Sequence, residues 1–93
     1  MIRDFKDKDA EKIFVRHSAR RLPVDIQRTA LRKLRMLHNA KTVDDLRAPP
    51  ANRLEKLRGT RDGQYSIRIN DQWRICFEWI ENNAHGVEIV DYH

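Results

Sequence analysis

The chain has 93 residues, which is enough for one domain spanning residues 1–93 with a compact core and leaves no room for a second domain. It carries 19 lysine and arginine residues against 14 aspartate and glutamate residues, for a formal net charge of +5. Its one cysteine, Cys76, excludes an intramolecular disulfide and a cysteine-based zinc cluster, and no apolar run is long enough for a signal peptide or a membrane span. We therefore expect a cytoplasmic protein with no membrane partner.

The positive charge is concentrated in the first three quarters of the chain. All 19 basic residues lie at or before Arg74, whereas residues 76–93 contain four acidic residues and no lysine or arginine. Such a surface favours a polyanion as partner, because contact with a phosphate backbone releases counterions whatever the nucleotide sequence. Nucleic acid is thus the favoured partner, and a basic face that serves only solubility is the alternative.

The first forty residues show a weak strand signal at residues 1–6 and then the apolar spacing of two amphipathic helices. Asp9 is the expected N-cap of the first helix, which would end between His17 and Arg21. Pro23 suits the first turn of the second helix. The side chains expected to share the inward face of each helix are Ala10, Ile13, Phe14 and His17 in the first, and Ile26, Ala30, Leu34 and Leu37 in the second.

The outward side of these helices is the most basic part of the sequence. Its cations are Arg20, Arg21, Arg28, Arg32, Lys33 and Arg35. We interpret Arg28, Arg32 and Arg35 as residues for docking to RNA or to a protein partner, and not for chemistry. An ordinary charged helix exterior is the alternative interpretation.

After residue 40 the pattern changes from helix to strand. Residues 42–45 resemble a capping box for one short turn, and Pro49 and Pro50 would stop any helix. Residues 65–69, 73–80 and 87–93 then alternate with period two, separated by turn residues at 61–63, 70–72 and 82–84. Connections this short favour an antiparallel meander. The predicted fold is α+β, with two N-terminal helices packed on a small, mainly antiparallel sheet.

The sequence offers no support for metal or nucleotide chemistry. The four histidines do not cluster, His85 falls in a predicted turn, and there is no glycine-rich phosphate loop or nucleophile elbow. We therefore expect no metal and no cofactor. Cys76 is interpreted as an ordinary sheet residue.

A few cations and proton carriers in the second half suit RNA cleavage. RNA can be cut by attack of its own 2′-hydroxyl on the adjacent phosphate, so an enzyme needs a base, an acid and a cation to stabilise the phosphorane. His93 or Glu55 could move protons, while Arg74 and Arg58 could bind phosphate oxygens. Strand alternation turns Arg74 away from the face that carries the aromatic residues. A salt-bridged sheet surface is the alternative interpretation.

Several runs of residues resemble the HigB branch of the RelE-like toxins. They are NRLEKLRG at 52–59, GQYSI at 63–67, NDQWRICF at 70–77 and VDYH at 90–93, together with the opening MIRDF. The resemblance covers nearly the whole chain in the same order, and the W-R-I-x-F block combined with a terminal D-Y-H is more specific than either piece.

The resemblance implies a microbial RNase fold and cleavage of messenger RNA in the ribosomal decoding site, next to 16S rRNA. It also implies a HigA-type antitoxin, a helix-turn-helix protein that neutralises the toxin and represses the shared operon. Operator DNA would then be contacted only through the antitoxin complex. A non-catalytic module that binds RNA or the ribosome is one alternative. A protein-interaction module whose partner supplies the chemistry is another.

The resemblance further implies roles for individual residues. Arg74 would stabilise phosphate, and His93 with Tyr92 would position or protonate the scissile group. Arg58 stands where relatives commonly have lysine, and Glu55 stands where several have histidine, so either Glu55 or His93 could be the base. We favour His93 for the proton step, because histidine titrates near neutral pH, and expect Glu55 to orient Arg58. The remaining candidate RNA-binding residues are Arg53, Lys56, Arg61 and Asp91.

Overall fold

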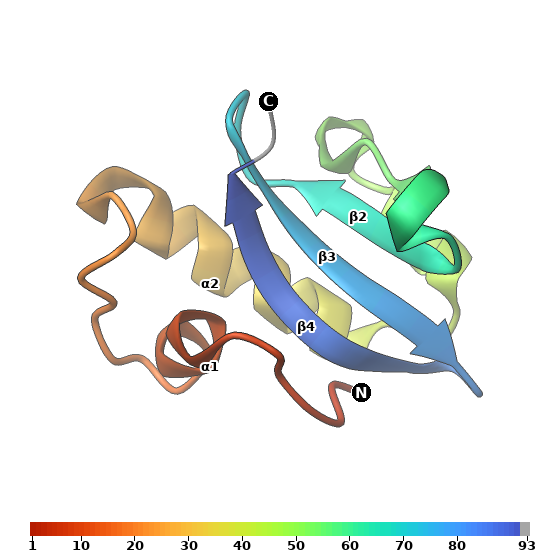
Figure 1. Cartoon of the computed structure of the whole chain (residues 1–93), viewed down its shortest axis with the longest axis horizontal. Helices are drawn as coiled ribbons and strands as arrows, with labels where there is room; N and C mark the ends of the chain where they lie inside the picture. The colour runs from red at the N-terminus through yellow and green to blue at the C-terminus, as the bar shows by residue number, and fades with distance from the viewer. Residues whose placement is uncertain (92–93) are drawn as a thin grey trace.

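The computed structural model describes residues 1–91. Its centre is a four-stranded antiparallel sheet of order β1-β2-β3-β4 (Figure 1). The α+β class and the antiparallel meander are confirmed. Tyr92 and His93, two of the predicted catalytic residues, lie outside the described residues. The strands are β1 (Glu55–Lys56), β2 (Gln64–Arg68), β3 (Trp73–Ile80) and β4 (Asn83–Asp91). The helices are α1 (Lys8–Phe14) and α2 (Val24–Asn39), with short 3-10 helices η1 (Val43–Arg47), η2 (Pro50–Asn52) and η3 (Gly59–Arg61).

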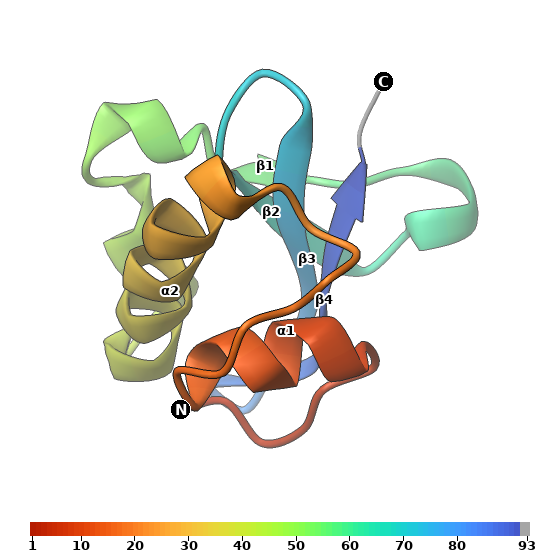
Figure 2. The same ribbon diagram turned by 90° about the vertical axis from the view of Figure 1, so that its left-hand side faces the viewer.

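The hydrophobic core lies between α2 and one face of the sheet, with α1 packed against α2 and β4. Seen nearly edge-on in Figure 2, the sheet has α2 on one side and the loop that carries η3 on the other. All four residues predicted on the inward face of the second helix are buried, and they pack with one face of the strands. The strand residues fully or almost fully buried in this core are Ile67, Ile75, Phe77, Ala84, Val87 and Ile89. The helical spacing of the second helix therefore predicted its buried face correctly.

The first helix begins earlier and ends earlier than predicted. Its N-cap is Asp7, whose side chain accepts a hydrogen bond from the backbone N–H of Asp9, so the prediction of Asp9 as the cap was wrong. The helix ends at Phe14, because the chain turns into the left-handed region at Arg16 (φ 68°). His17 is consequently exposed and does not lie on the inward face.

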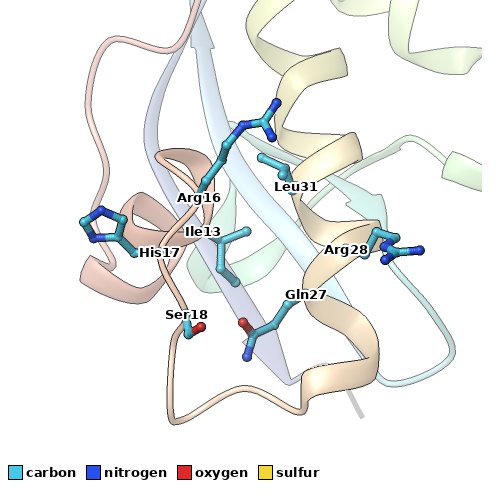
Figure 3. Close-up of a pocket in the computed structure, with 7 residues that line it drawn as sticks. All are labelled: Ile13, Arg16, His17, Ser18, Gln27, Arg28 and Leu31. Atoms are coloured by element: carbon cyan, nitrogen blue, oxygen red, sulfur yellow. The ribbon is translucent and has the colours of Figure 1, made fainter.

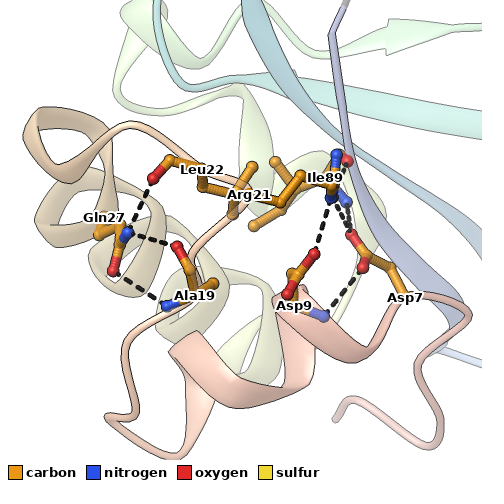
Figure 4. A network of polar contacts seen from close by, with 7 residues as sticks. All are labelled: Asp7, Asp9, Ala19, Arg21, Leu22, Gln27 and Ile89. Atoms are coloured by element: carbon orange, nitrogen blue, oxygen red, sulfur yellow. Dashed lines mark hydrogen bonds and ion pairs between the residues drawn. The ribbon is translucent and has the colours of Figure 1, made fainter.

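The loop between α1 and α2 is held from both sides by side chains (Figure 4). The amide of Gln27 donates to the carbonyl oxygens of Ala19 (2.9 Å) and Leu22 (3.0 Å) and accepts from the Ala19 N–H. On the other side, the Arg21 guanidinium bonds to Asp9 (2.7 Å), to Asp7 (3.0 Å) and to the carbonyl of Ile89 in β4. A loop without regular structure is thereby fixed to both helices and to the sheet.

The turn between β3 and β4 begins one residue earlier and ends two residues earlier than the predicted turn at residues 82–84. Glu81 (φ 51°) and Asn82 (φ 60°) form the two-residue loop, with the positive φ values that such tight hairpins require. Asn83, Ala84 and His85 therefore belong to β4, and the placement of His85 in the turn was wrong. Ala84 is fully buried, so extending the strand adds an apolar contact to the core.

The N-terminal segment runs parallel to β4 through isolated bridges that pair Ile2 with Ala84 and Phe5 with Val87, which confirms the weak strand signal. Between them, the Asp4 carboxylate accepts hydrogen bonds from the N–H of Gly86 (2.6 Å) and from Nδ1 of His85 (3.1 Å). These two donors, the Gly86 N–H first, hold the pKa of Asp4 below its usual range. The charged carboxylate thus fastens the N-terminus to the last strand.

We predict that Asp4→Asn lowers the free energy of unfolding at pH 7. A depressed pKa means that the folded chain favours the charged carboxylate, so this stabilisation is fully present above the pKa of the unfolded chain. It is lost as the pH falls through the folded pKa. Urea unfolding of both proteins from neutral to acidic pH should therefore give a difference that closes under acidic conditions. A difference that stays constant with pH would show that the charge of Asp4 is not its source.

Candidate active site

Arg74 is locked by hydrogen bonds on the sheet face opposite the helical core, the face predicted for it. Its Nε donates to Oγ of Ser66 (2.8 Å), and its Nη2 donates to the backbone carbonyl of Arg53 (2.6 Å). The residue is only 7% exposed. These bonds hold the guanidinium in one orientation on this face.

Glu55 is brought next to Arg74 by an edge strand that the sequence did not predict. The two-residue strand β1 pairs Glu55 with Ser66 and Lys56 with Tyr65. This register places Oε1 of Glu55 4.0 Å from Nη1 of Arg74, with the Glu55 side chain half exposed. We expected Glu55 to orient Arg58, but the ion pair in the structure joins it to Arg74.

A second guanidinium, that of Arg61 in η3, is held on the same face. Its Nη1 donates to Oε2 of Glu88 (3.1 Å) and to Oε1 of Gln64 (3.2 Å). Glu88 also lies 3.6 Å from Nζ of Lys6. Three residues of this site were not identified from the sequence, namely Gln64, Ser66 and Glu88. Once the register is known, strand alternation puts all three on the same sheet face as Arg74. The pairing Cys76↔Glu88 and Cys76↔Ser66 provides that register.

The Cys76 thiol lies on the same sheet face as Arg74 and Glu88. Burial is the main cause that raises its pKa, and Glu88 raises it further, while Arg61 and Arg74 oppose the shift. All three charged groups thus lie near one sulfur atom beneath the open face. A buried thiol whose pKa is raised stays protonated at pH 7 and is a poor nucleophile, which agrees with the interpretation of Cys76 as a sheet residue.

The other predicted site residues in this half of the chain are Arg53, Lys56, Arg58 and Asp91, and they lie outside the cluster around Arg74. Lys56 and Arg58 line an open pocket of about 540 Å³ with Leu57, Gly59 and Asp62. Arg53 is exposed and left-handed (φ 43°). Asp91 pairs in register with Trp73 and accepts a hydrogen bond from Nε2 of Gln72 (3.1 Å). These contacts place Asp91 at the end of the sheet.

The arginines of α2 belong to the helical layer, which covers the sheet face opposite to the one that carries Arg74. Arg28, Arg32 and Arg35 are exposed, as predicted. Arg28 lines a pocket of about 470 Å³ between α1 and α2, where Ile13 and Leu31 lie between the helices (Figure 3). Lys33, which the sequence assigned to the same basic exterior, is instead 4% exposed and donates to the side chain of Asn52. It lies three residues after Ala30 and four before Leu37, a spacing that puts it on the same side of the helix as these buried residues.

Among residues 1–91, no group of three or more histidine, cysteine, aspartate or glutamate side chains is arranged to hold a metal ion. In the same part of the chain, no helix is long and apolar enough to cross a membrane.

We predict that Arg74→Ala lowers the free energy of unfolding by about 1–3 kcal/mol, because it leaves the buried Ser66 hydroxyl and the Arg53 carbonyl without this donor. Strand alternation turned Arg74 away from the aromatic face but did not reveal these two bonds. Urea unfolding of the two proteins measures the difference. Equal unfolding midpoints and slopes would show that the guanidinium contributes nothing to the fold.

Comparisons with known proteins place the chain in a family. Residues 3–93 match the family described as RelE-like toxin of type II toxin-antitoxin system HigB. The chain is 41% identical to Toxin HigB-1 of Vibrio cholerae over 90% of both chains, and 31% identical to Endoribonuclease HigB of Proteus vulgaris over the full length of both. The fold is similar to a chain of the heterotetrameric YoeB-YefM toxin-antitoxin complex from Staphylococcus aureus, with a TM-score of 0.61 at 17% identity and coverage of 100% and 98%. The chain therefore belongs to the HigB-like family of RelE-like toxins of type II toxin-antitoxin systems.

Proposed function

We propose that this protein is a ribosome-dependent endoribonuclease that cuts messenger RNA and thereby inhibits translation. The observation that carries the proposal is the gathering of Arg74, Arg61 and Glu55 on one sheet face, with Arg74 held by two hydrogen bonds. Preorganised guanidinium groups suit a phosphate that gains charge in the transition state. The name of the Proteus vulgaris relative, an endoribonuclease, supports the same activity.

The proposed reaction uses the RNA's own 2′-hydroxyl and requires no metal ion. A base removes the 2′-hydroxyl proton, the oxygen attacks the adjacent phosphorus, and the bond from phosphorus to the 5′-oxygen breaks. An acid then gives a proton to that leaving oxygen, so the products are a 2′,3′-cyclic phosphate and a 5′-hydroxyl end. Arg74, together with Arg61 and Arg58, would neutralise the charge that develops on the phosphorane.

We assign the proton step to His93, assisted by Tyr92, both outside the described residues. Histidine changes its charge near neutral pH, which suits it to both proton uptake and release. Glu55 forms an ion pair with Arg74, which suits it to orient that guanidinium. Lys56 and Arg53 would bind neighbouring phosphates, and Asp91 would contact the RNA beside the terminal residues.

The proposed partners use opposite faces of the molecule. Messenger RNA would meet the face that carries Arg74, while Arg28, Arg32 and Arg35 on α2 would dock against ribosomal RNA near the decoding site. A HigA-type helix-turn-helix antitoxin would bind the toxin in the cytoplasm and link it to operator DNA. The similarity to the toxin-antitoxin family and to the YoeB-YefM complex supports an antitoxin partner.

The activity is tested by incubating the purified protein with programmed ribosomes and mapping new RNA 5′ ends. We predict that Arg74→Lys lowers the cleavage rate by about a hundredfold or more, since a lysine cannot reproduce the fork that meets two oxygens. A variant without His93 should lose cleavage as well. Arg47→Lys, at an exposed arginine paired with Asp44, is the matched control and should cut normally. Parental rates in folded Arg74→Lys would remove Arg74 from the catalytic site, and ribosome binding without new 5′ ends in the parent would favour a non-catalytic binder.

The same assay identifies the base. Glu55→Gln should keep most of the activity, and the pH-rate profile of the parent should show an ionisation in the histidine range that disappears when His93 is replaced. If Glu55→Gln instead costs about a thousandfold, the upper part of what general base catalysis contributes, the assignment is reversed and Glu55 is the base.

We predict that reversing Arg28, Arg32 and Arg35 to glutamate weakens ribosome binding and makes its salt dependence shallower, because fewer phosphate contacts release counterions. Binding is measured at several salt concentrations. The control changes the net charge equally at three exposed lysines elsewhere, Lys8, Lys12 and Lys41. If both triple variants bind alike, the arginines of α2 act only through net charge.

A further inference from the structure

Asn52 has a fully buried side chain whose amide both donates and accepts hydrogen bonds. Its Nδ2 donates to the backbone carbonyl oxygens of Leu46 (3.2 Å) and Ala48 (3.3 Å). Its Oδ1 accepts a hydrogen bond from Nζ of Lys33, which comes from α2 and is also buried. One side chain thus ties η1, the following proline segment and α2 together.

The residue that follows Asn52 makes direct contact with the candidate catalytic arginine. Arg53 is in the left-handed region (φ 43°, ψ 57°), a strained conformation for a residue with a Cβ that persists only where the surroundings impose it. Its N–H donates to the carbonyl of Pro50 (3.0 Å), and its own carbonyl accepts from Nη2 of Arg74 at 2.6 Å. The position of this carbonyl therefore depends on how the segment that ends at Asn52 is fixed.

We propose that Asn52 is a positioning residue for Arg74, and that Lys33 holds Asn52 in place from the helical layer. The inference rests on the proposed role of Arg74 in cleavage. It extends the site through the protein, from the guanidinium on the open face to an amine in the opposite layer. Each link is a hydrogen bond or a peptide bond, in the order Lys33, Asn52, Arg53 and Arg74.

Burying the Lys33 amine is unfavourable for the stability of the fold. Burial is the first cause that lowers its pKa, and the nearby positive charges of Arg32 and Arg68 lower it further. An apolar pair of similar size often replaces buried polar groups without loss of stability. The hydrogen bond from Lys33 to Asn52 is therefore better explained by the position it gives to Asn52 than by a gain in stability.

The test replaces the polar pair with apolar side chains, in the full-length double variant Lys33→Met/Asn52→Leu. The Nε–H resonance of Arg74, identified by its loss in Arg74→Lys, is followed by NMR in the free protein. We expect this resonance to shift or broaden, and kcat of cleavage on programmed ribosomes to fall about ten- to hundredfold with KM changed less than about twofold. An unchanged resonance, or an unchanged kcat, in the folded double variant would overturn the proposal.

A matched control separates positioning from general destabilisation. Gln27→Leu removes another side-chain amide that holds a loop, the one between α1 and α2 (Figure 4). It should lower stability while leaving the Arg74 resonance and kcat unchanged. A shift of the resonance in Gln27→Leu as large as in the double variant would overturn the proposal, because the effect would then follow stability rather than position.

A second pair of variants serves if the double variant does not fold. Lys33→Gln keeps a donor for Oδ1 of Asn52, whereas Lys33→Met removes it. We expect Lys33→Gln to keep the parental resonance and kcat, and Lys33→Met to change both; equal behaviour of the two would overturn the proposal. The NMR measurement needs no cleavage. A resonance that moves while Arg74→Lys cuts normally would therefore contradict the proposed function and leave the positioning of Arg74 supported.

Discussion

The hydrogen bonds of the Arg74 guanidinium are the constraint on which the arrangement of this site depends. Nε bonds to Ser66 in β2, and Nη2 bonds to the backbone of Arg53, just before β1. One side chain from β3 therefore joins the central sheet to its irregular edge. Since β1 has only two residues, few ladder hydrogen bonds fix that edge, and the guanidinium supplies part of what a longer strand would provide. Glu55, which lies in β1, is brought within 4.0 Å of Arg74 as a result.

The antiparallel register then divides the molecule into two functional sides. One face of the sheet is apolar and is covered by the helical layer, while the other carries charged and hydrogen-bonding groups above Cys76. Arg61 and Glu88 are far from Arg74 in the chain. The register brings Glu88 to the same face, and Arg61 reaches that face through its hydrogen bond to Glu88. The arginines of α2 are separated from that face by the core. A messenger RNA and a second partner could therefore be bound without competing for the same side chains.

The parts of this structure that periodicity governs could be predicted from the sequence. Period two turned Arg74 away from Trp73 and Ile75, and helical spacing gave the buried stripe of α2. The parts that depend on tertiary pairing could not. No local pattern identifies a two-residue strand such as β1, because its pairing with β2 exists only in the folded chain. Lys33 was misplaced for the same reason: only the approach of Asn52 provides a buried amine with an acceptor.

The structural role of Arg74 and its proposed role in phosphate binding together constrain how the site could change. A guanidinium that supports the edge of the sheet and binds phosphate must satisfy both sets of contacts at once, so its replacement affects folding and activity together. Glu55 is under a weaker constraint, since its side chain is half exposed and meets Arg74 at 4.0 Å. An exposed edge position tolerates different polar side chains, whereas a buried arginine with two fixed acceptors does not.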